Sequence, residues 1–281
     1  MALAYHNLAT GSSRRPAMAN GAFQIRLTHD AIPLTNVVPS FPSIDSLEKY
    51  VGVWLNQEIT TYADNQPPTT IIYLTDFLPI ENNLQMDLIN DFISDIETAL
   101  DVETEKISLA DTWQASPPQG VADVSVHEYL KDVKTNITKS LDRIHVNPTT
   151  RFRWDLAKDI STETHEGTMR GLEVYKEWLL EHILQIQKRN ALVIFPITGQ
   201  EVDYRETPPP IPKFLFSEIN NKTVGELKYQ SRISGSEEHL PVVVSALGKS
   251  GSDMALIDAI KKVLKHSGRP TEIRTGRRMF Q

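Results

Sequence analysis

The stretch TIIYLTDFLPIENNLQMDLINDFISDIETAL, residues 70–100, decides the fold class. Its first part, TIIYLTD (70–76), is rich in β-branched and aromatic side chains and predicts a buried strand. From Asn83 to Leu100 the spacing predicts a helix with one buried face, because apolar residues recur at every fourth position: Leu84, Leu88, Phe92, Ile96 and Leu100. A strand followed directly by a helix is the building unit of α/β proteins, so we predict an α/β fold.

The rest of the chain repeats this alternation. Two further apolar runs, ALVIFP (191–196) and PVVVSAL (241–247), predict buried strands, and KISLADTW (106–113) predicts a short strand or a loop. Residues 1–70 predict loops and short strands. The expected helices cover 126–141, 161–188 with Ser161 as N-cap, and a segment that begins after the N-cap Ser252 and ends at Gly268.

Composition sets limits on the function. The 281 residues suit a single domain spanning 1–281, and no cysteine is present, which excludes disulfides, thiol catalysis and Cys-ligated metals. The formal net charge of −7 argues against nucleic acid and anionic membranes as partners. No apolar run reaches the about 18 residues of a membrane span. We therefore expect a cytoplasmic protein that binds neither nucleic acid nor membrane.

Several motifs have plain structural explanations. LGKSGSD (247–253) resembles a phosphate loop, but the required first glycine falls on Val243, so a turn that caps a helix is favoured. RFRWDLAK (151–158) interleaves cations with aromatic residues, and packing is favoured over nucleic-acid binding. His182, inside an expected helix, is favoured as a surface residue. The histidines show no zinc-binding spacing, so we expect neither a metal nor a cofactor.

Two acidic residues, Asp76 and Glu81, follow the predicted strand 70–76. Sites in α/β proteins often form where strands end, which makes both residues candidates. Solvation of an ordinary loop explains them equally well.

The segment TGSSRRPAMANG (10–21) holds a serine that follows a glycine, Ser12. A serine nucleophile needs a base within hydrogen-bond reach and N–H donors aimed at the developing oxyanion. Gly11 allows backbone N–H groups to converge, but nothing nearby in the sequence supplies the base. From the residues alone, a turn is the favoured interpretation.

The longer stretch TGSSRRPAMANGAFQIRLTH (10–29) resembles the nucleophile segment of the amidase signature family. The resemblance places the nucleophile at Ser12, the oxyanion loop at Thr10 and Gly11, and a supporting cation at Arg14. NVVPSFPSIDS (36–46) resembles a later segment of that family. The implied activity is hydrolysis of linear carboxylic amides through a serine acyl-enzyme, without metal or cofactor.

Downstream segments resemble the fungal amidase-like branch of the family. They are RFRWDLAKDIS (151–161), ALVIFPITGQEVDYRETPPP (191–210) and EEHLPVVVSALGKSGSDMALIDAIKKVLKHSGRPTEIRTGRRMF (237–280). The resemblance implies a mixed twisted sheet with helices on both faces. It also implies that the chain corresponds to the C-terminal half of the family's domain, beginning at the nucleophile loop.

The chain departs from the family pattern at three positions. Glycine is usual where this chain has Thr10 and Glu48, and aspartate is usual where it has Leu8. The family's catalytic lysine and cis-serine precede the nucleophile and have no counterpart here. We therefore expect weak or absent activity from the chain alone. The alternatives are a non-catalytic amidase-like binding or assembly protein, and binding of a small amide without turnover. An incomplete sheet is expected to leave an edge exposed for self-association.

Overall fold

The computed structural model describes residues 21–28, 40–55, 66–131, 133, 159–196 and 220–273. The strands in this part of the chain are β1 (Phe23–Ile25), β2 (Ser40–Phe41), β3 (Thr70–Leu74), β4 (Glu103–Ile107), β5 (Ala191–Pro196), β6 (Asn220–Gln230) and β7 (Glu237–Leu247). The helices are α2 (Ile44–Trp54), α3 (Asn83–Leu100), α4 (Leu109–Ala115), α5 (Val126–Leu130), α8 (Thr162–Trp178), the π-helix η2 (Leu179–Leu184) and α9 (Asp253–His266).

The described strands form one seven-stranded sheet in the order β2-β1-β6-β7-β5-β3-β4. β3 pairs in parallel with both β4 and β5, and the other pairings are antiparallel. The sheet is therefore mixed, and the α/β prediction is confirmed. The three parallel strands are β4, β3 and β5, and β3 is the strand predicted from residues 70–76. Helices lie between these strands in the chain, because parallel strands need crossover connections.

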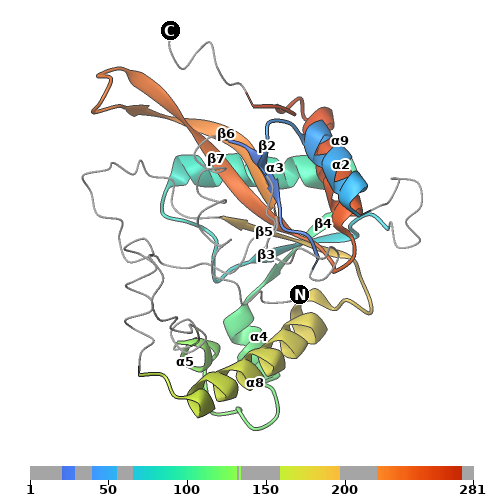
Figure 1. The fold of residues 1–281 in the computed structure, drawn as a ribbon, viewed down its shortest axis with the longest axis vertical. Helices are drawn as coiled ribbons and strands as arrows, with labels where there is room; N and C mark the ends of the chain where they lie inside the picture. The colour runs from blue at the N-terminus through green and yellow to red at the C-terminus, as the bar shows by residue number, and fades with distance from the viewer. Residues whose placement is uncertain are drawn as a thin grey trace.

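Helices cover both faces of the sheet (Figure 1). On one side, the α3 face, α2, α3 and α9 contribute to a core that includes Leu47, Phe92 and Ile260. On the other side, the α8 face, α4, α8 and η2 contribute to a second core that includes Trp113, Tyr175 and Ile183. Alternate residues of the central strands feed the two cores, so these strands are apolar on both sides.

Helix α3 has the bounds that the sequence predicts. Asn82 caps its start by accepting a hydrogen bond from the Gln85 N–H at 3.1 Å, and Asp101 ends it in the left-handed conformation, with φ of 55°. The buried stripe is rotated from the expected one. Leu84 is 69% exposed, while Gln85 is fully buried.

Helix α8 begins as predicted, because the Ser161 side chain accepts a hydrogen bond from the Thr164 N–H at 3.1 Å. The helix then widens into η2 and ends at Leu184 instead of Lys188, where Gln185 turns the chain with a φ of 47°. Of the helix expected over 126–141, α5 is described, and most of the remaining range lies outside the described residues.

The expectations for 106–113 and for residues 1–70 are partly wrong. Strand β4 ends at Ile107, and α4 follows it directly. Helix α2 lies where only loops and short strands were expected. The prediction missed it because the apolar Tyr50 and Val53 on its exposed face obscure the periodicity of its buried residues. Strand β6 was not predicted at all, since its polar sequence NNKTVGELKYQ becomes a strand through pairing with β7.

Among the described residues, no helix has the length and apolar character that crossing a membrane requires.

Candidate functional site

The connections that leave the carboxyl ends of the neighbouring strands β3 and β5 lead to opposite sides of the sheet. From β3 the chain passes through α3 to β4, whereas from β5 it continues to β6, on the opposite side of β3 in the sheet. In open α/β sheets, ligands bind outside the carboxyl ends of strands at such a switch point. We call the residues Thr75–Phe77 and Phe195 the switch-point edge and take it as the candidate functional site.

Asp76 lies at this edge, and its role in the structure is to cap a helix. Its carboxylate accepts hydrogen bonds from the N–H groups of Leu109, at 2.5 Å, and Ala110, at 3.1 Å. The Ser108 hydroxyl donates to the same carboxylate at 3.1 Å. Asp76 therefore caps the start of α4 from the turn that follows β3. Glu81 is exposed in the segment before α3 and is not part of this capping arrangement.

Replacing Asp76 by alanine is expected to destabilise the protein by about 0.5–2 kcal/mol, because three donors at the start of α4 lose their acceptor. Urea unfolding measures the change. Glu81→Ala is the control, with an expected change within about 0.5 kcal/mol. A wild-type-like free energy of unfolding for Asp76→Ala would show that the cap contributes nothing.

An aromatic cluster lies beneath this edge on the α8 face. Trp113 packs against Trp178 with ring centroids 4.9 Å apart, and Tyr175 stacks on Trp178 at 5.9 Å. Burial, and secondarily the negative charge of Asp76, raises the pKa of the Tyr175 phenol. Tyr175 is therefore a neutral packing residue and is unsuited to act as a base at neutral pH.

The edge also holds residues that the sequence analysis did not single out. Phe77 and Phe195 contact edge to face, with centroids 6.0 Å apart, and Ser245 of β7 is the cross-strand partner of Phe195. The available signal was a hydroxyl inside the otherwise apolar run PVVVSAL. Periodicity alone does not distinguish such a serine from a tolerated core residue.

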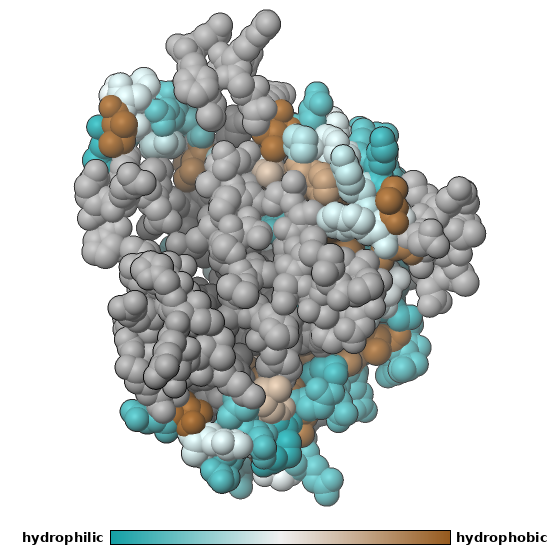
Figure 2. All heavy atoms as spheres, viewed as in Figure 1, coloured by the Kyte–Doolittle hydropathy of each residue, from teal (hydrophilic) through white to brown (hydrophobic). Residues whose placement is uncertain are grey.

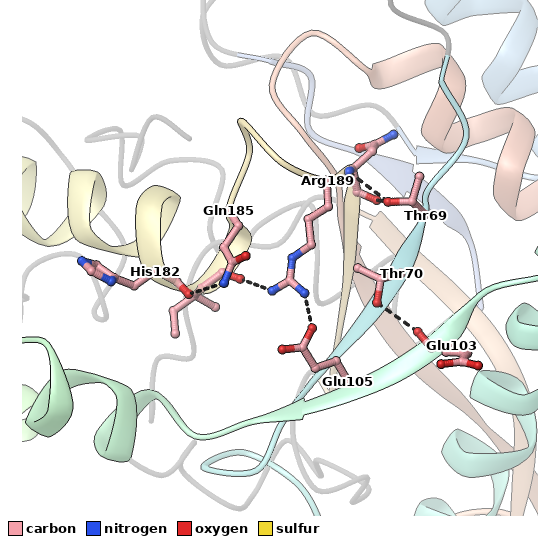
Figure 3. A network of polar contacts seen from close by, with 9 residues as sticks. Thr69, Thr70, Glu103, Glu105, His182, Gln185 and Arg189 are labelled. Atoms are coloured by element: carbon pink, nitrogen blue, oxygen red, sulfur yellow. Dashed lines mark hydrogen bonds and ion pairs between the residues drawn. The ribbon is translucent and has the colours of Figure 1, made fainter.

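The amino ends of the parallel strands carry a different polar network (Figure 3). Arg189 forms an ion pair with Glu105 on β4 and donates to the Ile183 carbonyl at 2.8 Å, so it joins η2 to the sheet. The Thr70 hydroxyl donates to the Glu103 carbonyl at 3.0 Å. These bonds fasten strand starts to one another, on the edge opposite to the switch point, and we interpret them as structural.

The segment LGKSGSD forms a turn, as favoured from the sequence. Gly251 adopts a φ of 83°, and its N–H donates to the Thr28 hydroxyl at 2.8 Å. Asp253, in the first turn of α9, accepts from the Thr28 N–H at 2.8 Å. The turn therefore fastens the chain after β1 to the start of α9, and it places the buried carboxylate of Asp253 in the first turn of that helix.

Burial raises the pKa of the Asp253 carboxyl, although the bonds from Thr28 oppose this shift. With a folded-state pKa above the unfolded value, its contribution to stability is full at acid pH and is lost as the pH rises through the folded pKa. The free energy of unfolding of Asp253→Asn, taken relative to that of wild type, is therefore expected to increase as the pH rises from acid to neutral. Urea unfolding across a pH series measures this, with Asp258→Asn as control. Parallel pH profiles for Asp253→Asn and wild type would contradict it.

The residues of the predicted nucleophile loop, Thr10, Gly11, Ser12 and Arg14, lie outside the described residues, as does RFRWDLAK. In sequence, the loop precedes β1. His182 lies on η2 with a side chain 33% exposed, and its ring lies 5.8 Å from that of Trp178, so it is at the edge of the α8-face core. Within the described part of the chain, no group of three or more His, Asp or Glu side chains is arranged to hold a metal ion.

The fold is similar to that of solved amide hydrolases, whereas no family model matches the sequence. A bacterial aryl acylamidase of the amidase signature family aligns with a TM-score of 0.57 and 13% identity, over 92% of this chain and 61% of that one. A Kluyveromyces lactis allophanate hydrolase aligns with a TM-score of 0.56 and 16% identity, over 95% and 47%. A 6-aminohexanoate cyclic dimer hydrolase aligns with a TM-score of 0.57 and 11% identity, over 92% and 63%.

At these identities the likeness establishes the fold. The chain has the α/β architecture of amidase signature hydrolases over nearly all of its length. It spans less than two thirds of the length of each of these three structures.

Proposed function

We propose that this chain is an amidase-like protein of the fungal amidase-like branch, corresponding to the C-terminal half of the family's domain. The observation that carries the proposal is the alignment of 92–95% of the chain with amide hydrolases. The motif resemblance around Ser12 supports it. We further propose a cytoplasmic location, as expected from the sequence.

The proposed chemistry is acyl transfer at Ser12. The hydroxyl oxygen attacks the amide carbonyl carbon, backbone N–H groups near Thr10 and Gly11 stabilise the oxyanion, and the amine leaves with a proton. Water then hydrolyses the ester. Because members of a catalytic set act as a unit, a nucleophile without the family's lysine and cis-serine loses several orders of magnitude in rate. We therefore propose weak activity for the chain alone.

Labelling of the purified 281-residue protein with a fluorophosphonate probe tests this proposal. The expected result is slow labelling that disappears in Ser12→Ala and persists in the neighbouring control Ser13→Ala. Circular dichroism confirms that each variant is folded. Absence of labelling at Ser12 in a folded sample would reject the catalytic proposal and favour the non-catalytic alternative.

A surface on α2 favours that alternative, an assembly role through self-association. Tyr50, Val53 and Trp54 are 51%, 69% and 36% exposed, and Phe41 on β2 stacks against Tyr50 with centroids 5.1 Å apart. Figure 2 shows brown, apolar surface between polar residues on the side where α2 and α9 lie in Figure 1. The patch adjoins the β2 edge of the described sheet.

The opposite edge is protected. Strand β4 exposes the charged Glu103 and Glu105, and the Thr104 N–H is already bonded to the Glu97 carboxylate at 3.1 Å. We therefore propose that two copies associate through their α2 patches, since a two-fold axis places the same surface on both sides of a contact.

Sedimentation velocity over a concentration series tests the self-association. Wild type is expected to form dimers that the double variant Tyr50→Ser/Val53→Ser loses. Leu84→Ser is the control, because Leu84 on α3 is as exposed as Val53, at 69%. Equal association constants for the three proteins would reject the α2 patch as the interface.

A further inference from the structure

Ser245 on β7 is buried, with 1% of the residue exposed. Within the part of the chain that the structure describes, its Oγ has no hydrogen-bond partner. Burying a hydroxyl without a partner costs stability, and nearly all buried polar side chains in proteins avoid that cost. A serine at this position therefore calls for a role that alanine or valine would not serve.

The hydroxyl belongs to the α8 face of the sheet. Leu247, two residues further along β7, packs in the α8-face core, whereas Val244 and Ala246 pack in the α3-face core. Its cross-strand partner Phe195 points to the same side, because directly opposed residues of an antiparallel pair share a face. Ser245 therefore has the apolar Phe195 opposite it on β5 and Asn221 opposite it on β6.

This position adjoins the switch-point edge. Phe195 is the next-to-last residue of β5, and its ring meets the edge of Phe77, which follows β3, at an interplanar angle of 70°. Both rings are half-buried. The fold rule for open α/β sheets places ligands at this edge, and the Ser245 hydroxyl lies beside the two aromatic rings that the edge contributes.

We propose that the Ser245 hydroxyl donates a hydrogen bond to the carbonyl oxygen of a small carboxylic amide whose apolar group packs against Phe77 and Phe195. A bound carbonyl satisfies the donor that the protein leaves unpaired, and the aromatic rings suit an aryl or alkyl substituent. The choice of an amide as ligand rests on the proposed function. The subsite itself rests on the position of Ser245.

Titration of the full-length protein with benzamide, followed by NMR, tests the subsite. Saturable binding is expected to weaken at least about 10-fold in Ser245→Ala, as for loss of one buried hydrogen bond. Binding should be unchanged in Ser234→Ala, a serine in the exposed β6–β7 turn. Equal affinity of wild type and Ser245→Ala, or no saturable binding by wild type, would overturn the proposal.

Two further measurements separate a ligand contact from a packing role. The melting temperature of Ser245→Ala is expected to equal or exceed that of wild type, because an unpaired hydroxyl is removed, and a clear decrease would overturn the proposal. In wild type, benzamide is expected to bind at least about 10-fold more tightly than toluene, which lacks the carbonyl. Equal binding of the two compounds would also overturn it.

The result is distinguishable from the outcome at Ser12. Benzamide binding that depends on Ser245, in a protein that fluorophosphonate does not label, would leave the subsite standing and reject acyl transfer. Labelling at Ser12 without any effect of Ser245→Ala on benzamide would do the reverse.

Discussion

Trp113→Ala is expected to lower the free energy of unfolding by about 3–5 kcal/mol, the usual cost of removing a large buried aromatic side chain. Trp113 is 2% exposed and contacts the rings of Tyr129, Tyr175 and Trp178. Its indole N–H donates to the Val124 carbonyl at 2.7 Å. The substitution removes the centre of the α8-face core and leaves that carbonyl without its donor. Urea unfolding measures the change.

Two controls identify the source of this loss. Trp54→Ala removes the same side chain from an exposed site and should cost about 1 kcal/mol or less. Trp113→Phe keeps most of the packing and loses the hydrogen bond, so an intermediate cost is expected. If Trp113→Ala and Trp54→Ala proved equally stable, the α8-face core would contribute little to folding.

Phe92→Ala is expected to have a comparable effect, about 3–5 kcal/mol, on the other side of the sheet. Phe92 is fully buried in the α3-face core. The guanidinium of Arg269 lies 5.5 Å from the centroid of its ring, and the Arg269 Nε–H donates to Asp95 at 2.6 Å. The substitution therefore opens a cavity and also removes an aromatic partner of Arg269.

Leu84→Ala on the same helix is the matched control, because Leu84 is 69% exposed and its loss should change stability by about 0.5 kcal/mol or less. A double-mutant cycle with Arg269→Ala measures the cation–π contact, for which we expect about 0.5–2 kcal/mol. A cost for Phe92→Ala as small as that of Leu84→Ala would contradict the burial of this face of α3.

Local patterns in the sequence were sufficient for the elements whose signals lie within one segment. The bounds of α3 followed from its periodicity, and β5 followed from a continuous apolar run. Ser161 and Ser252 were correctly placed at the N-cap positions of α8 and α9, although only the Ser161 side chain accepts a capping hydrogen bond. Such signals work because the buried face of one element leaves a regular trace in its own residues.

Signals that depend on distant residues were missed. Helix α4 is short, so its own N-cap, Ser108, gave only a weak signal, and the additional cap from Asp76 comes from the distant turn after β3. Strand β6 is polar and is stabilised by its ladder with β7. The importance of Ser245 depends on what surrounds it, and burial without a partner is a property of the packed structure.

The sequence by itself determined the α/β class, the apolar segments of β3, α3, β5, β7 and α9, and the resemblance that predicts Ser12 as nucleophile. Only the tertiary structure decided that Asp76 is a helix cap, that LGKSGSD fastens Thr28 to α9, and that β3 and β5 diverge at a switch point. The physical reason is that periodicity records the burial of one segment, whereas strand order, capping across elements and the pairing of buried polar groups arise from contacts between residues far apart in the chain.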